Sequence, residues 1–225
     1  THCDEGRNFL AHSNSRYDVI QIHSNHTTSS IANGSGGAMP VYLQTVDAYR
    51  DYLSHLTADG ILQINYFVYP RMITTAAEAW SQIFPGDDFA GHLVITSGFG
   101  IMPTFLVKRS LWSAAEISEI RRFMGSEFPD IFKDNRIIYA PGQAEAASVP
   151  TELFKVPLSE AVADSVPYQI SPPTDNRPFF RNLRKEVKPL EVDGGGYVTP
   201  DTVVFLNSSL RGSIPMESVH LYLLG

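Results

Sequence analysis

Two histidines three residues apart, His23 and His26, have an evident capacity for chemistry. A neutral imidazole accepts a proton near pH 7, so His23 could serve as a general base. The same pair could bind a metal, but a structural zinc site needs four ligands. The only cysteine is Cys3, and no nearby carboxylate completes such a set, so the sequence predicts no metal site.

A second polar group, Asp175 and Arg177, precedes two aromatic residues, Phe179 and Phe180. The carboxylate and the guanidinium could form one wall of a ligand site or a contact between domains. They could also pair with each other while the phenylalanines anchor this part of the chain on the core, since phenylalanine buries a large apolar area. We favour the second interpretation. Serine-hydrolase chemistry has little support, because no Gly-x-Ser-x-Gly elbow precedes a predicted helix.

A sheet edge would position the two histidines. The run Tyr17–Ile22 is apolar and rich in β-formers, which is typical of a parallel strand covered on both faces. Thr45 can cap a helix that Gly60 ends, and residues 61–68 predict the next buried strand. In α/β folds of this kind ligands bind beyond the carboxyl ends of the strands, which is where the histidines follow the first strand.

The middle of the chain predicts two more helices and the end of the sheet. Thr75-Ala-Ala-Glu78 and Ser113-Ala-Ala-Glu116 are capping boxes, and each indicates a helix start. Residues 92–96 and 104–108 flank a Gly-Phe-Gly turn and predict an antiparallel pair, with one further short strand at residues 136–139. We therefore expect a Rossmann-like, mostly parallel α/β domain.

Composition limits the class of protein and its partners. The expected domain covers residues 1–140, and a Pro/Gly-rich extension over residues 141–225 packs on it. The net charge is −7, and no basic run exceeds the pair Arg184-Lys185, so nucleic acid is not an expected partner. No apolar run reaches the ~18 residues that span a bilayer, and no signal peptide is present, so we expect a cytoplasmic location.

Two segments resemble the spermidine synthase family, and most closely the spermidine-synthase-like soluble domains of bacterial multi-pass membrane proteins. The first is the Tyr-Asp-Val-Ile strand, preceded by Glu-Gly-Arg-Asn-Phe-Leu and followed by a helix ending in Asp-Gly-Ile-Leu. The second, Thr-Asp-Asn-Arg-Pro-Phe-Phe at residues 174–180, is similar to a late signature of those domains, with Asn176 in its second acidic position. The resemblance covers roughly residues 3–70 and 170–182. It implies the later portion of an S-adenosylmethionine-dependent transferase fold.

The resemblance also implies roles for single residues. Glu5 or Asp4, with Gly6, occupies the place where the family contacts the nucleoside of S-adenosylmethionine or its decarboxylated form. His23 replaces the family's catalytic aspartate, and His26 replaces a second acid that holds the substrate. Each lost charge pairing at about 4 Å is worth up to ~4 kcal/mol at an effective dielectric of ~20, so polyamine binding is expected to be weak. Two further candidate substrate contacts are Asp175 and Arg177.

The leading hypothesis is thus a degenerate spermidine-synthase-like transferase domain, of aminopropyl- or methyltransferase type. We expect it to belong to a larger protein, on the cytoplasmic side of a membrane. No glycine-rich turn or ribose-binding acid precedes Asp4, so the cofactor site is expected to be incomplete and residues 17–22 to form an edge strand or one covered by a partner. The alternative is a non-catalytic binding or assembly module. Its residues 175–180 and 219–225 would contact the rest of the protein or a second copy.

Overall fold

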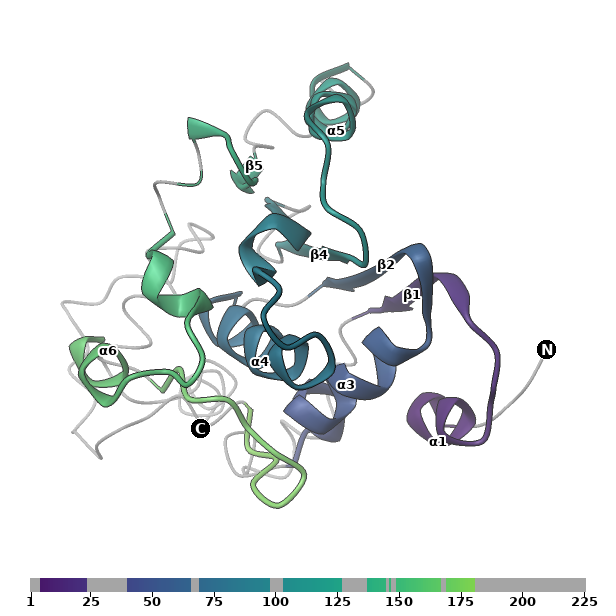
Figure 1. The fold of residues 1–225 in the computed structure, drawn as a ribbon, viewed down its shortest axis with the longest axis vertical. Helices are drawn as coiled ribbons and strands as arrows, with labels where there is room; N and C mark the ends of the chain where they lie inside the picture. The colour runs from purple at the N-terminus through teal and green to yellow at the C-terminus, as the bar shows by residue number, and fades with distance from the viewer. Residues whose placement is uncertain are drawn as a thin grey trace, which may run out of the picture.

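The computed structural model describes residues 5–23, 40–65, 69–97, 103–126, 137–144, 146, 149–166 and 169–180, and the fold is that of these residues. Five strands form one sheet in the order β1-β2-β4-β3-β5. Helices lie on both sides of it, with α3 and α4 on one face and α5 on the other (Figure 1). The mixed α/β content predicted from the sequence is confirmed.

The first two strands, β1 (Tyr17–Ile22) and β2 (Leu56–Asn65), pair in parallel. β4 (Thr104–Lys108) lies between β2 and β3 (Leu93–Thr96) and is antiparallel to both, and β5 (Ile137–Tyr139) is antiparallel to β3. The predicted antiparallel pair and the further short strand are confirmed. The expectation of a mostly parallel sheet is not met, because three of the four strand pairings are antiparallel once β4 lies between β2 and β3.

The edge position of β1 is confirmed for the described residues, but its predicted burial on both faces is wrong. None of its six residues is buried, and Val19 is 59% exposed. Only one side of β1 carries a described neighbour, β2. Ile20 and Ile22 pack against the main core, while Val19 and Gln21 alternate with them, as the two-residue repeat of a strand requires.

Helix α3 (Val46–Ser54) starts where the sequence predicts and ends earlier. The Thr45 hydroxyl accepts the Ala48 amide at 3.1 Å and caps the helix. The helix ends at Ser54, with His55 as its C-cap, whereas Gly60 lies inside β2. Gly60 instead lies at an irregularity of the strand pairing, where β2 advances from Leu56 to Ile61 while β1 advances only from Tyr17 to Val19.

The two predicted capping boxes have different outcomes. Ser113 and Glu116 form the expected reciprocal bonds at the start of α5 (Ala114–Ser126), at 3.2 and 2.9 Å. Helix α4 (Tyr69–Ile83) instead begins well before Thr75, whose hydroxyl donates to the Arg71 carbonyl within the helix at 2.6 Å. Pro70 in the first turn is a better marker of this start.

Short helices complete the described chain. They are α1 (Gly6–Ala11), α6 (Glu160–Ser165) and the 3-10 turns Tyr42–Gln44, Phe89–His92 and Thr151–Phe154. None of the described helices is long and apolar enough to cross a membrane.

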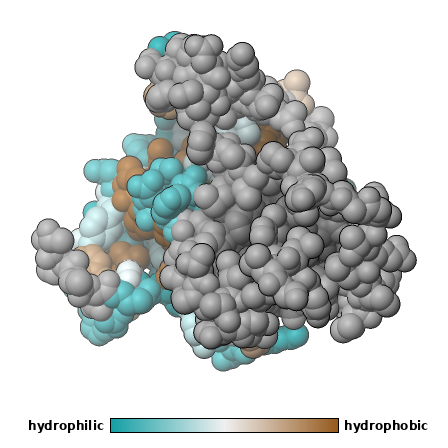
Figure 2. All heavy atoms as spheres, turned by 180° about the vertical axis from the view of Figure 1, so that it is seen from behind, coloured by the Kyte–Doolittle hydropathy of each residue, from teal (hydrophilic) through white to brown (hydrophobic). Residues whose placement is uncertain are grey.

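The main core lies between the sheet and the layer of α3 and α4. Trp80, Tyr49 and Phe105 are the largest of its fully buried side chains. Residues from the later part of the chain, including Ile170 and Phe180, belong to the same cluster. A smaller cluster joins α5 to the opposite face. Seen from behind, the described surface mixes hydrophilic and hydrophobic residues (Figure 2).

Gly60 is the tightest point of the β1–β2 pairing. A Cβ there would lie 2.8 Å from the Tyr17 carbonyl oxygen and 2.9 Å from the Thr57 nitrogen. We predict that Gly60→Ala lowers the free energy of unfolding by about 1–3 kcal/mol, because two backbone segments must move apart. Gly125→Ala on α5 is the matched control, since its Cβ would meet nothing within 4 Å and should add about 0.5–1 kcal/mol. Urea unfolding measures both, and equal effects would contradict the prediction.

Candidate functional site

The carboxyl ends of β1, β2 and β3 lie at the same end of the sheet as the start of β4. Asn65 ends β2 and donates from its side-chain amide to the Thr104 hydroxyl at 2.8 Å. His23 directly follows β1 and is exposed, so it lies at the carboxyl end of the strand, as the sequence predicts. His26 and Asp4 lie outside the described residues.

Glu5 and Gly6 form the start of α1. Glu5 is the N-cap, and its carboxylate accepts the Asn8 amide at 2.9 Å, so the acid is favoured at this helix start even without a ligand. Glu5 is exposed, and a Cβ on Gly6 would meet nothing within 4 Å. An approaching group would thus meet a carboxylate and a piece of backbone without a side chain.

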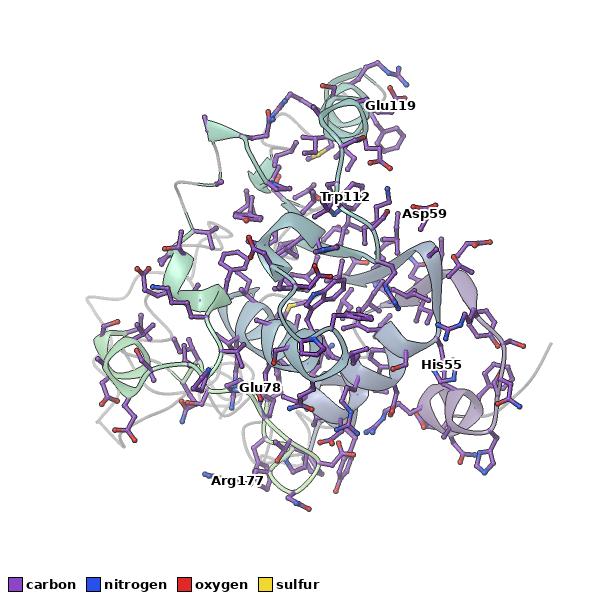
Figure 3. The ribbon with its side chains drawn as sticks, in the orientation of Figure 1. His55, Asp59, Glu78, Trp112, Glu119 and Arg177 are labelled. Carbon is purple, nitrogen blue, oxygen red and sulfur yellow. The ribbon has the colours of Figure 1, made fainter. Side chains whose placement is uncertain are left out.

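Asp175 pairs with a residue that the sequence reasoning missed. Arg7 donates from its two terminal nitrogens to both Asp175 oxygens, each at 3.0 Å. The expected local pairing of Asp175 with Arg177 is therefore wrong. The cause is a tight turn, closed by the Arg177 amide and the Thr174 carbonyl at 2.9 Å, that leaves Arg177 exposed on the outside of the loop (Figure 3). Their roles as substrate contacts stay predictions.

The Arg7 guanidinium links three parts of the chain. Its Nε donates to Asp51 on α3 at 2.9 Å, and one terminal nitrogen also donates to the Tyr42 carbonyl at 3.1 Å. Asp175 accepts in addition the Thr45 hydroxyl at 2.6 Å. The start of α1, the cap of α3 and the late Thr-Asp-Asn-Arg segment are thereby joined. A signal for Arg7 exists in the Glu-Gly-Arg motif, but nothing in the sequence names its partner.

Electrostatics keep this cluster fully charged. Burial alone would raise the pKa of Asp175, but the hydrogen bonds from Arg7 and Thr45 outweigh it and lower the pKa. For Arg7, the hydrogen bonds to Asp175 and Asp51 outweigh the opposing effect of burial, and its pKa is raised. Burial raises the pKa of the neighbouring Tyr52. At neutral pH Asp175 is therefore ionised, holds the Arg7 guanidinium and is not a proton donor.

A second arginine, Arg71, binds both ends of the longer segment of residues 171–180, which contains the Thr-Asp-Asn-Arg turn. Arg71 is 6% exposed, and its Nε donates to the Ser171 carbonyl at 3.0 Å. One terminal nitrogen donates to the carbonyls of Phe179 and Phe180, at 3.0 and 2.7 Å. The predicted aromatic anchor is confirmed for Phe180, which is fully buried, but Phe179 is 40% exposed.

A further ion pair lies on the opposite face of the sheet. Lys108 on β4 is buried and bonds Glu116 on α5, and this bond, with the bonds from Ser113, lowers the pKa of Glu116 to about 2. Both partners are satisfied, so this pair is structural. Among the described residues, no three His, Cys, Asp or Glu side chains are arranged to hold a metal ion.

Comparisons with known proteins do not place the chain in a family. No protein-family model matches it, and no curated protein matches it significantly. The resemblance to spermidine synthases therefore depends on the two sequence segments alone.

The Arg71 bonds give a prediction about stability. Arg71→Met keeps most of the side-chain volume but leaves the carbonyls of Ser171, Phe179 and Phe180 without this donor. We expect the free energy of unfolding to fall by about 2–4 kcal/mol, measured by urea denaturation. Arg122→Met, at an exposed position of α5, is the control and should leave the midpoint nearly unchanged. Similar midpoints for both variants would show that the Arg71 bonds stabilise nothing.

The lowered pKa of Asp175 predicts a pH dependence. The unfolded chain binds the Asp175 proton more readily than the folded chain, so this contribution is present above about pH 4 and is lost as the pH falls below it. Wild type should therefore lose more stability between about pH 6 and about pH 3 than Asp175→Asn does. Urea midpoints at the two pH values measure this difference. Glu160→Gln controls for removing one exposed negative charge, and parallel pH profiles for wild type and Asp175→Asn would refute the prediction.

Proposed function

We propose that this chain is a spermidine-synthase-like, S-adenosylmethionine-dependent transferase-type domain, with its strands forming the later part of a Rossmann-like sheet. The observation that carries the proposal is the parallel pairing of β1 with β2, from Val19 beside Ile61 to Ile22 beside Ile64. The resemblance depends on these two segments ending at the same end of the sheet, where His23 directly follows β1. The antiparallel β3–β4 pair that follows β2 in the sheet is a further point of agreement.

Glu5 and Gly6 are the residues that fit a nucleoside. A carboxylate accepts hydrogen bonds from ribose hydroxyls or from the amino group of adenine. The open space beside Gly6 lets the base or the sugar approach the backbone. When bound, S-adenosylmethionine or its decarboxylated form supplies an alkyl group on a positively charged sulfur.

His23 is the residue of this chain that could take up a proton from an attacking amine. Its exposed imidazole follows β1, at the position that an aspartate occupies in spermidine synthases. An imidazole can act as a base near neutral pH, but it does not attract a polycation as a carboxylate does. We therefore propose a degenerate domain, in which nucleoside binding persists and transfer to a polyamine is weak.

One observation favours the alternative of a non-catalytic assembly module. β1 is an edge strand among the described residues, and Val19 on it is 59% exposed. A strand from the rest of a larger protein, or from a second copy, could pair with this edge through its backbone. Absence of any nucleoside binding would favour this second function.

The proposal predicts nucleoside binding that depends on Glu5. Calorimetry of the full chain with S-adenosylmethionine, its decarboxylated form and 5′-methylthioadenosine should show heat of binding at millimolar ligand. Glu5→Gln should weaken the affinity about tenfold, the equivalent of one charge-assisted hydrogen bond.

Gly6→Ala tests the open backbone in the same experiment. Its Cβ meets nothing within 4 Å, so folding should be unaffected while a ligand lying against Gly6 is displaced. Glu160→Gln, at the exposed first turn of α6, is the control for lost charge and should bind as wild type does. No heat with any of the three ligands would count against the transferase proposal.

A further inference from the structure

Resting on the proposed function, we propose that Asp175 is a positioning residue: by holding Arg7 it fixes the start of α1, which carries Glu5, against the chain at Tyr42, so that both face one nucleoside. The late Thr-Asp-Asn-Arg segment then acts on the ligand through Arg7. Asp175 itself makes no contact with the ligand in this proposal.

Arg7 connects the two contacts because its rigid guanidinium, carried by α1, binds both the Tyr42 carbonyl and Asp175. It belongs to the first turn of α1, two residues after Glu5, and also donates to the Tyr42 carbonyl at 3.1 Å. Its side chain is 17% exposed and is fixed by two carboxylates, those of Asp51 and Asp175. A planar guanidinium bound in this way has a defined orientation, which a lysine ammonium would not have.

Asp175 is in turn held from α3. Its Oδ1 accepts the Thr45 hydroxyl at 2.6 Å, and its backbone amide donates to Asp47 at 2.9 Å. Thr45 also caps α3 through the Ala48 amide. The carboxylate that binds Arg7 therefore has its position set by the first turn of a packed helix. This rigid support is what a residue that orients a binding group requires.

Tyr42 offers the second contact to the ligand. It begins a 3-10 turn before α3 and is 51% exposed, although its carbonyl is bound by Arg7. An exposed aromatic ring of this kind can stack on a nucleobase, while Glu5 binds hydroxyl or amino groups. Loss of the Arg7–Asp175 pair would leave Arg7 held only by Asp51 and the Tyr42 carbonyl, so the two contacts would be less firmly oriented and a ligand that needs both would bind more weakly.

Calorimetry with 5′-methylthioadenosine on the full chain tests the proposal. Asp175→Asn should weaken binding about tenfold, and Arg7→Lys, which keeps the charge without the fork, should weaken it less than Arg7→Ala does. The matched control is the exposed pair Arg122 and Glu119 on α5, in the variants Arg122→Lys and Glu119→Gln. Both control variants should bind as wild type does.

A double-mutant cycle separates positioning from general stability. If Asp175 acts through Glu5, then Glu5→Gln should cost little further affinity in the Asp175→Asn background. If Asp175 has a purely structural effect, the two losses of affinity should instead add up. Additive losses, or an Asp175→Asn variant with unchanged affinity, would overturn the positioning role and leave the proposed function standing. Failure of wild type to bind would remove both. If Asp175→Asn does not fold, Arg7→Lys decides: wild-type affinity in that variant overturns the proposal.

Discussion

The structure depends on a buried guanidinium. Arg71, inside the first turns of α4, binds backbone carbonyls at both ends of the segment from Ser171 to Phe180, and this segment in turn closes the core next to α3 and α4. A buried backbone carbonyl without a donor costs about 1–3 kcal/mol, so irregular chain can lie here only because a donor reaches it. Arginine suits the task because its nitrogens point in fixed directions and its charge cannot be neutralised. Arg71 thus supplies three of the hydrogen bonds that hold this segment on the core, beside the bonds that Asp175 accepts from Arg7 and Thr45.

The chemical meaning of the late Thr-Asp-Asn-Arg segment changes once its partners are known. From residue types alone, Asp175 and Arg177 suggest either a ligand wall or a local ion pair. In the fold, Asp175 binds a partner that precedes it by 168 residues, and the turn directs Arg177 outward. A sequence motif near the end of the described chain therefore reports on the geometry of its beginning. If the chain is a transferase domain as proposed, the two motifs that carry the resemblance are parts of one physical unit.

Local signals in the sequence predicted the elements well, and long-range relations poorly. The Thr45 cap, the Ser113–Glu116 box and the strand at β1 depend on neighbouring residues, so they can be recognised from the sequence. The insertion of β4 between β2 and β3 depends on strand pairing across the sheet, which short-range periodicity does not encode. The predicted helix start at Thr75 is wrong because a threonine hydroxyl can cap a helix but can also donate to a carbonyl inside one, as Thr75 does to Arg71. The partners of Arg7 and Arg71 had no local signal.

The extra residues of β2 near Gly60 have a mechanical consequence for the exposed strand. Because a Cβ at Gly60 would lie 2.8 Å from the Tyr17 carbonyl oxygen, a slip of β1 that set this carbonyl against a residue with a side chain would cause a clash. An edge strand held in one register presents its outward backbone N–H and C=O groups at fixed positions along the sheet. A polypeptide that adds a strand beside β1 would therefore pair with it in a register that depends on Gly60 of β2.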